Sequence, residues 1–267
     1  MIALIGNPDP LTYSVASALR AQGRPVVICR LVDHDPEGDL PGDQIAFRIE
    51  HLGTLLERLV AMGVTEACLV GAVSRPRVDP SRIDAATLPL MPRIAAAMRE
   101  GDDGALRALI ALLEEMGLAV RAAHELAPSL LPPAGVLSVA RPARSHEADV
   151  LRAEAVHRII APADIGQGLV VRDGQVLAVE AAPGTDWMLR SLRGQAEGAV
   201  FYKAPKRCQD RRADLPVIGP ATIDRAREAG IAAVVIEAGG VMMLNREIAV
   251  AHADAAGIVL WVREPGP

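Results

Sequence analysis

The first half of the chain alternates short apolar runs with segments whose apolar residues recur at helical spacing. Apolar runs at 2–5, 25–31 and 66–73 have the length and composition of buried strands. Segments 12–23 and 52–63 have helical periodicity and end at a glycine. Strands that alternate with helices predict a Rossmann-like parallel sheet with helices on its faces.

An amphipathic helix within 101–120 and a fourth strand at 118–122 follow in this pattern. A proline-rich stretch at 128–135 then interrupts it and reads as a linker. We therefore predict an N-terminal domain over 1–127 and a second domain over 136–267.

The second half also mixes helical and strand-like segments, with a different order. A helix is expected at 148–160, and alternating residues on both sides of Asp173-Gly174 predict a β-hairpin. Thr185 is expected to be the N-cap of the next helix. The remaining elements are helices at 220–229 and 246–256 and strands at 231–238, 241–244 and 257–262. The sequence thus predicts two α/β domains, a Rossmann-like parallel sheet followed by a mixed α/β domain, with a cleft between them.

Composition limits the classes of partner. The 267 residues have a formal net charge of -5, a pI near 5.7 and only 2% aromatic residues. These values argue against nucleic-acid binding, which needs a basic surface or stacking aromatic residues. No apolar run reaches the ~20 residues that span a bilayer, and the chain opens without a signal-peptide pattern. We expect a cytoplasmic protein and leave a membrane-peripheral location open.

A cationic loop stands out in this acidic chain. Residues 202–220 contain two carboxylates, Asp210 and Asp214, among five cations: Lys203, Lys206, Arg207, Arg211 and Arg212. Nearby cations keep carboxylates ionised. Cations can then neutralise phosphate oxygens while the acids hold a divalent ion or orient a water molecule. A solvated charged surface is the alternative, but the prolines in this loop favour phosphate chemistry.

Two further loops are candidates for substrate contact. Gly6 and Asn7 follow the first strand, and ligands of parallel sheets bind beyond the carboxyl ends of strands; a tight turn explains the same residues equally well. The start of a helix at Gly184, Thr185 and Asp186 suits a phosphate group, or Thr185 simply caps that helix.

Several stretches in the same order resemble a known family. The loop APKRCQDRRADLPVIGP is similar to the K-x-x-Q-[DE]-x-R-x-D-L-P-T-I-G pattern of the LpxI-type UDP-2,3-diacylglucosamine diphosphatases. Further matches are GAVSRP at 71–76, GDDGALR at 101–107, AHE at 123–125, the stretch 164–189 and EAGG at 237–240. They cover nearly the whole chain, and together they are far more specific than any single motif.

The resemblance implies an activity and a set of site residues. The family hydrolyses UDP-2,3-diacylglucosamine to UMP and the acylated sugar phosphate (lipid X) in lipid A synthesis, with Mg²⁺ or alternatively Mn²⁺. It implies that Asp214 is the first catalytic and metal-binding candidate and Asp210 the second. The expected substrate-binding residues are Gly6, Asn7, Ser74, Arg75, Gly184, Thr185, Asp186, Lys203, Lys206, Gln209 and Arg212.

The sequence departs from the family pattern at four places, and some alternatives stay open. The departures are the Asn7-Pro8-Asp9-Pro10 turn, Ala72, Arg207 and Val217. A non-catalytic sensor of a nucleotide sugar or lipid phosphate, and a hydrolase of another nucleotide diphosphate, are the alternative functions. The acyl chains could lie along 128–137 or the Leu106–Leu113 helix face, and the oligomeric state is open.

Overall fold

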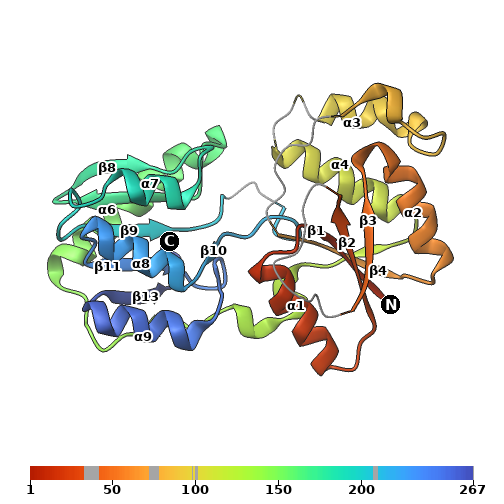
Figure 1. The fold of residues 1–267 in the computed structure, drawn as a ribbon. Helices are drawn as coiled ribbons and strands as arrows, with labels where there is room; N and C mark the ends of the chain where they lie inside the picture. The colour runs from red at the N-terminus through yellow and green to blue at the C-terminus, as the bar shows by residue number, and fades with distance from the viewer. Residues whose placement is uncertain (33–41, 72–77, 98, 100–101, 207–209, 267) are drawn as a thin grey trace. The chain divides into compact units, whose positions relative to one another are not determined.

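The structure is a computed structural model that describes residues 1–32, 42–71, 78–97, 99, 102–206 and 210–266 (Figure 1). The chain divides into two compact units. The first comprises Met1–Pro128 and Asp210–Asp214, and the second comprises Ser129–Gln209 and Leu215–Pro267. The sequence prediction had not anticipated that Asp210–Asp214 packs with the first unit.

A parallel five-stranded sheet forms the first unit, in the order β3-β2-β1-β4-β5. Its strands are β1 (Ile2–Gly6), β2 (Val26–Leu31), β3 (Asp43–Phe47), β4 (Glu66–Val70) and β5 (Ala119–Val120). The strand order runs in opposite directions from β1, so the switch point lies between β1 and β4, where such sheets bind ligands. The Rossmann-like parallel sheet is confirmed, and β3 is a strand that the sequence did not reveal.

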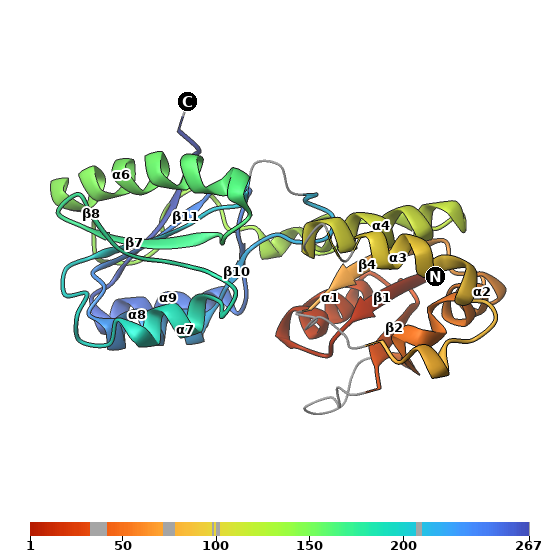
Figure 2. The same cartoon turned by 90° about the horizontal axis from the view of Figure 1, so that it is seen from above.

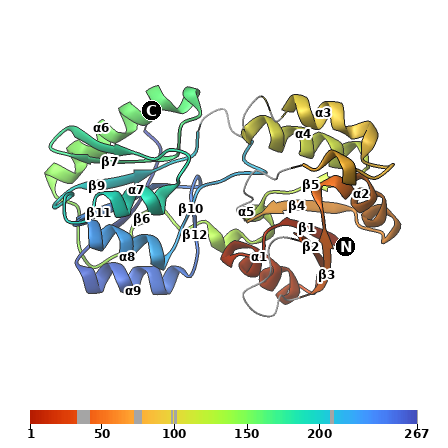
Figure 3. The same ribbon diagram turned by 45° about the horizontal axis from the view of Figure 1, so that its top comes forward.

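Helices cover this sheet. They are α1 (Pro10–Ala21), α2 (Leu52–Ala61), α3 (Met91–Ala97), α4 (Asp102–Glu115) and α5 (Ala123–Leu126). The apolar faces of α2 and α4 share one buried cluster with Ala3, Ile5 and Leu69 of the strands. Figure 3 shows α5 beside β4, which it contacts. The periodicity of α4 thus predicted its buried face, and α2 is confirmed as a helix.

The second unit contains a mixed six-stranded sheet in the order β6-β13-β11-β9-β7-β8. Its strands are β6 (Gly135–Val136), β7 (Gly168–Arg172), β8 (Gln175–Val179), β9 (Val200–Lys203), β11 (Ala233–Glu237) and β13 (Val259–Arg263). Strands β9, β11 and β13 are parallel, whereas β6, β7 and β8 make antiparallel pairs. A separate parallel pair joins β10 (Val217–Ile218) and β12 (Met242–Met243). The mixed α/β architecture is confirmed.

In the part of this unit that the structure describes, four helices enclose the sheet: α6 (Arg144–Ile160), α7 (Thr185–Ser191), α8 (Pro220–Ala229) and α9 (Arg246–Ala256). Helix α6 covers one face, where it packs on Val171 and Tyr202; α7, α8 and α9 cover the other, with Val170 and Phe201 (Figure 2). Successive strand residues point to opposite faces, so each strand contributes to both cores. No helix among the described residues combines the length and apolar character needed to cross a membrane.

Short 3-10 helices complete the described chain. They are η1 (Ile49–His51), η2 (Pro80–Arg82), η3 (Leu88–Leu90), η4 (Pro128–Leu130) and η5 (Ala161–Ala163). The helix η4 lies within the stretch that the sequence identified as a linker.

The sequence predictions for single turns and caps of the second unit are partly confirmed and partly wrong. The hairpin is confirmed, because Asp173 and Gly174 join β7 to β8 with φ values of 51° and 76°, as a type I′ turn requires. Two predictions are wrong: Lys203 lies in strand β9 instead of a loop, and Thr185 is the first residue of α7, with Gly184 as its N-cap.

Candidate functional site

The turn after β1 is closely packed. A Cβ atom on Gly6 would lie 1.7 Å from the carbonyl oxygen of Val70, so only glycine fits there. Asp9 caps α1 by accepting a hydrogen bond from the Thr12 N–H (3.0 Å), and the Thr12 hydroxyl donates to the carbonyl oxygen of Asn7 (2.6 Å). These contacts explain the turn through packing and capping. A substrate contact by Gly6 or Asn7 stays a prediction.

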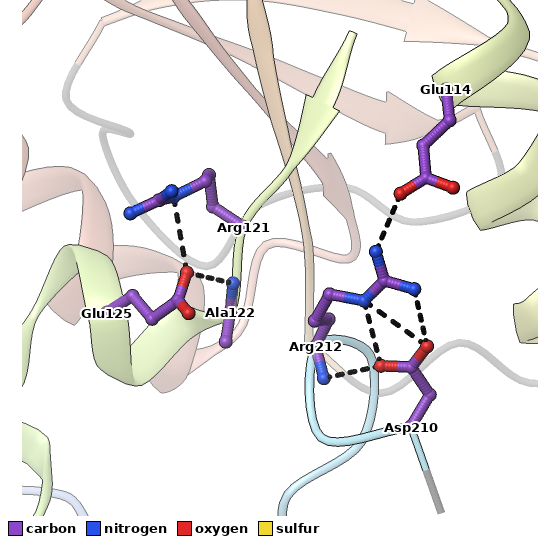
Figure 4. A network of polar contacts seen from close by, with 6 residues as sticks. All are labelled: Glu114, Arg121, Ala122, Glu125, Asp210 and Arg212. Atoms are coloured by element: carbon purple, nitrogen blue, oxygen red, sulfur yellow. Dashed lines mark hydrogen bonds and ion pairs between the residues drawn. The ribbon is translucent and has the colours of Figure 1, made fainter.

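The segment Asp210–Asp214 carries the acids of the cationic loop into the first unit. Ala213 packs against the buried cluster formed by the first sheet and its helices. The Arg212 guanidinium donates to Asp210 and, through Nη1, to Glu114 Oε1 of α4 at 2.6 Å (Figure 4). This ion-pair group therefore holds the segment against α4.

Asp210 is fully engaged within this segment. Its Oδ1 accepts from the Arg212 backbone N–H and from Nε, both at 3.0 Å, and its Oδ2 accepts from Nη2 at 2.7 Å. The hydrogen bonds from Arg212 hold the pKa of Asp210 below its ordinary value, with Arg107 acting in the same direction. Asp210 is thus ionised. Both of its carboxylate oxygens accept hydrogen bonds from Arg212, which favours a positioning role for Asp210 over metal binding.

Asp214 closes the same turn. The Asp214 and Ala213 N–H groups donate to the Asp210 carbonyl oxygen, at 3.4 and 3.1 Å. The Asp214 side chain is half-buried, and the buried Leu215 and Pro216 follow it. The backbone of Asp214 is therefore held within this turn.

Two further cations and a histidine act on this region. Burial, and then the charge of Arg211, lower the pKa of His124 below its ordinary value of 6.5. His124 is therefore uncharged at neutral pH. Sequence reasoning did not select Arg107 as a site residue, although it lies in the GDDGALR stretch that resembled the family.

Lys203 and Thr185 meet in the interior of the second unit. The Lys203 ammonium donates to Glu180 Oε2 (3.0 Å) and Oε1 (3.3 Å), and also to the Thr185 hydroxyl. Lys203 and Glu180 are both buried. Glu180 was missed by sequence reasoning, although it lies in the matched stretch 164–189.

Lys206 has an acidic partner as well. Its ammonium forms an ion pair with Asp164, whose backbone is left-handed with φ of 53°.

Asp186 lies in the first turn of α7. Its backbone carbonyl oxygen accepts a hydrogen bond from Arg190 Nε at 3.1 Å. The negative charge of the Asp186 side chain is favourable at this end of a helix.

The structure thus groups the predicted residues in two places. Asp210, Arg212 and Asp214 pack with the first unit, although Arg212 was expected in the second. Gly184, Thr185, Asp186, Lys203 and Lys206 are in the second unit. Ser74, Arg75 and Gln209 lie outside the described residues.

The donor chemistry limits how a metal could be held. Among the residues that the structure describes, no group of three or more His, Cys, Asp or Glu side chains could enclose a metal ion. Mg²⁺ needs no such cage, because it commonly uses one or two carboxylates together with water and substrate phosphate oxygens. Both oxygens of Asp210 accept hydrogen bonds from Arg212, which makes Asp210 less suited to this second arrangement.

Fold and site together define a two-domain α/β protein whose charged groups gather at strand ends and in one cation-rich loop. Residues 1–130 match the LpxI N-terminal domain, and residues 133–261 match the LpxI C-terminal domain. The UDP-2,3-diacylglucosamine pyrophosphatase LpxI of Caulobacter vibrioides is 40% identical over 275 residues, which cover 99% of this chain and 98% of that protein. The chain belongs to the LpxI family.

Proposed function

We propose that the chain hydrolyses the diphosphate bond of UDP-2,3-diacylglucosamine, giving UMP and 2,3-diacylglucosamine 1-phosphate for lipid A biosynthesis. The observation that carries this proposal is the end-to-end similarity to the pyrophosphatase of Caulobacter vibrioides. Similarity across both domains supports the same activity better than a single shared motif would. A non-catalytic nucleotide-sugar sensor would need only the cations, and no observation favours it.

Asp214 is the residue proposed to act on the attacking water. An ionised carboxylate held in a rigid turn can accept a hydrogen bond from water and orient its lone pair toward phosphorus. The water oxygen forms a bond to the phosphorus nearer the sugar, and the bond from that phosphorus to the bridging oxygen breaks. UMP then leaves with the bridging oxygen, and the new oxygen stays in the sugar phosphate.

Cations and backbone groups are proposed to bind the diphosphate. Arg211 is an exposed residue of the Asp210–Asp214 turn and supplies positive charge, while Arg212 keeps the turn in place. Lys206, Gln209 and the Gly184–Asp186 turn are proposed to bind the substrate from the second unit. From the first unit, we propose Gly6, Asn7, Ser74 and Arg75.

A divalent cation is part of the proposal, with Mg²⁺ first and Mn²⁺ second. When bound, such an ion neutralises phosphate oxygens and stabilises the leaving oxygen. Asp214 is the proposed protein ligand, and the substrate would supply the other charged oxygens. Because the substrate carries two acyl chains, we also place the enzyme at the cytoplasmic surface of a membrane.

The test measures UMP release from UDP-2,3-diacylglucosamine by the purified protein. We expect turnover with Mg²⁺, no turnover in excess EDTA, and ¹⁸O from labelled water in the sugar phosphate alone. UDP-GlcNAc and CDP-diacylglycerol are control substrates that separate this activity from a general diphosphatase. Binding without UMP release would identify a sensor, and full turnover in EDTA would remove the metal from the proposal.

A further inference from the structure

Three side chains from separate segments meet inside the second unit. Lys203 ends β9, Glu180 directly follows β8, and Thr185 begins α7. The Lys203 ammonium contacts both Glu180 oxygens and the Thr185 hydroxyl, and the Thr185 hydroxyl donates to Glu180 Oε1 at 2.9 Å. These contacts join the exit of the hairpin, the start of a helix and the strand that leads into the cationic loop.

Counting donors leaves no place for a phosphate oxygen at Lys203. An ammonium group has three N–H donors, and a hydroxyl group has one. Among the residues that the structure describes, the three acceptors around Lys203 are the two oxygens of Glu180 and the oxygen of Thr185, and the Thr185 proton is used toward Glu180. A phosphate oxygen that took one of these donors would leave part of a buried ion pair uncompensated, which is strongly unfavourable.

The backbone is shaped around the Glu180 carboxylate. A Cβ atom on Gly168 would lie 2.7 Å from Glu180 Oε2 and 2.9 Å from Cε2 of Phe201. A Cβ atom on Gly166 would lie 2.1 Å from the Glu180 carbonyl oxygen. The Glu180 N–H also donates to the Gly168 carbonyl oxygen at 2.8 Å. Gly168 therefore makes room for this carboxylate, and Gly166 makes room for the Glu180 backbone.

The cationic loop begins at this point of the chain. Ala204 follows Lys203, and its N–H donates to the Gln167 carbonyl oxygen at 3.0 Å. The start of the loop is thus fixed both through the Lys203 side chain and through the next backbone group.

We propose that Glu180, Lys203 and Thr185 form a positioning network that fixes the start of the cationic loop and the Gly184–Thr185 turn, and that Lys203 does not bind the diphosphate. This inference rests on the proposed hydrolase function, because it assigns a role within that reaction. It also gives Glu180 a role and removes Lys203 from the substrate-binding set.

The decisive experiment replaces both members of the ion pair by apolar side chains of similar size. Lys203→Met alone leaves Glu180 buried without its cation, and we expect kcat to fall on the order of 10²-fold through misplacement of the loop. The double variant Glu180→Leu/Lys203→Met removes both charges, and we expect kcat and KM to return to within about tenfold of wild type, since apolar pairs often replace buried ion pairs. A folded double variant as inactive as Lys203→Met would overturn the inference, because the substrate itself would then need the ammonium charge.

A second variant keeps the inference testable if the double variant does not fold. Glu180→Gln preserves shape and removes one negative charge beside Lys203. A positioning network predicts a lower kcat with KM unchanged or raised. Direct binding predicts a lower KM with kcat retained, because the released ammonium would attract the diphosphate more strongly, and that result would contradict the inference. Wild-type protein in the same assay tests the proposed function separately: without UMP release by wild type, the hydrolase proposal itself fails.

Discussion

Two ion-pair groups begin within ten residues of each other in the chain, yet they lie in different surroundings. The Lys203 and Glu180 side chains are 4% and 11% exposed, inside the second unit. The Arg212 and Glu114 side chains are 38% and 48% exposed, at the edge of the first unit. Each group pairs a cation, Lys203 of β9 or Arg212 of the loop that follows, with an acid from another segment.

The difference in exposure changes what each pair contributes. A buried pair stabilises little relative to apolar residues, but loss of one partner is costly because the other charge stays out of water. An exposed pair is hydrated and screened, so its loss costs little. Replacing Lys203 should therefore destabilise the protein much more than replacing Arg212, although both residues are cations close together in the sequence.

The largest effect is expected where the buried pair is broken. Lys203→Met should lower the free energy of unfolding of the second unit by about 3–5 kcal/mol, because Glu180 stays buried without its partner. Urea unfolding followed by circular dichroism measures this. Arg225→Met is the matched control in the same unit, because Arg225 makes a more exposed pair with Glu228 at 3.4 Å, with side chains 33% and 29% exposed, and it should cost about 0–1 kcal/mol. Equal losses in the two variants would show that burial does not distinguish the pairs.

The next effect separates Asp214 from Asp210, the two acids of the Asp210–Asp214 segment. Asp214→Asn removes the charge of the proposed catalytic acid with little change of shape, so kcat should fall about 10²–10³-fold, as when one key electrostatic group is lost. UMP release by a variant with an unchanged melting temperature measures this. Asp210→Asn is the matched variant and should lose less, because Asp210 serves Arg212. A folded Asp214→Asn variant within tenfold of wild type would exclude Asp214 and make Asp210 the candidate.

A smaller effect is expected from crowding the buried pair. Gly168→Ala places a methyl group against the Glu180 carboxylate and the Phe201 ring, and overpacking of this kind costs about 1–3 kcal/mol. Thermal unfolding measures the loss. The control is Gly194→Ser, at a position where a Cβ would meet no neighbour within 4 Å but φ is 67°, so it reports backbone strain without crowding. If Gly168→Ala melts like wild type, the space around Glu180 is less constrained than proposed.

The smallest effect concerns acid stability of the exposed group. Arg212 lowers the pKa of Asp210 in the folded protein, so Asp210 binds a proton more weakly when folded than when unfolded. Its contribution is therefore present above the unfolded pKa of about 3.8 and is lost as the pH falls through the lower folded value. We expect about 1 kcal/mol or less, measured as the difference in unfolding free energy between wild type and Asp210→Asn from pH 7 down to pH 3. A difference that does not shrink on acidification would contradict this.

Local patterns predicted much of the fold but less of the site. The Asp173-Gly174 hairpin and the helices flanking it follow from residues that are neighbours in sequence, so the sequence revealed them. The strand β9 was missed because Tyr202 and Lys203 begin a stretch rich in charges and prolines, which resembles a loop. Thr185 was assigned as a cap because its type suits one, but its hydroxyl instead bonds to Glu180, and Gly184 occupies the capping position.

The sequence by itself determined the family and the two-domain α/β architecture, because periodicity and ordered motifs are properties of the chain. Only the tertiary structure decided which cation of the loop meets which acid. Arg212 pairs with Glu114, 98 residues away, and Lys203 pairs with Glu180, 23 residues away. Charge attraction acts between any opposite charges that folding brings close, and its strength depends on burial. The residues next to Lys203 in the sequence therefore predict neither its ion-pair partner nor its burial.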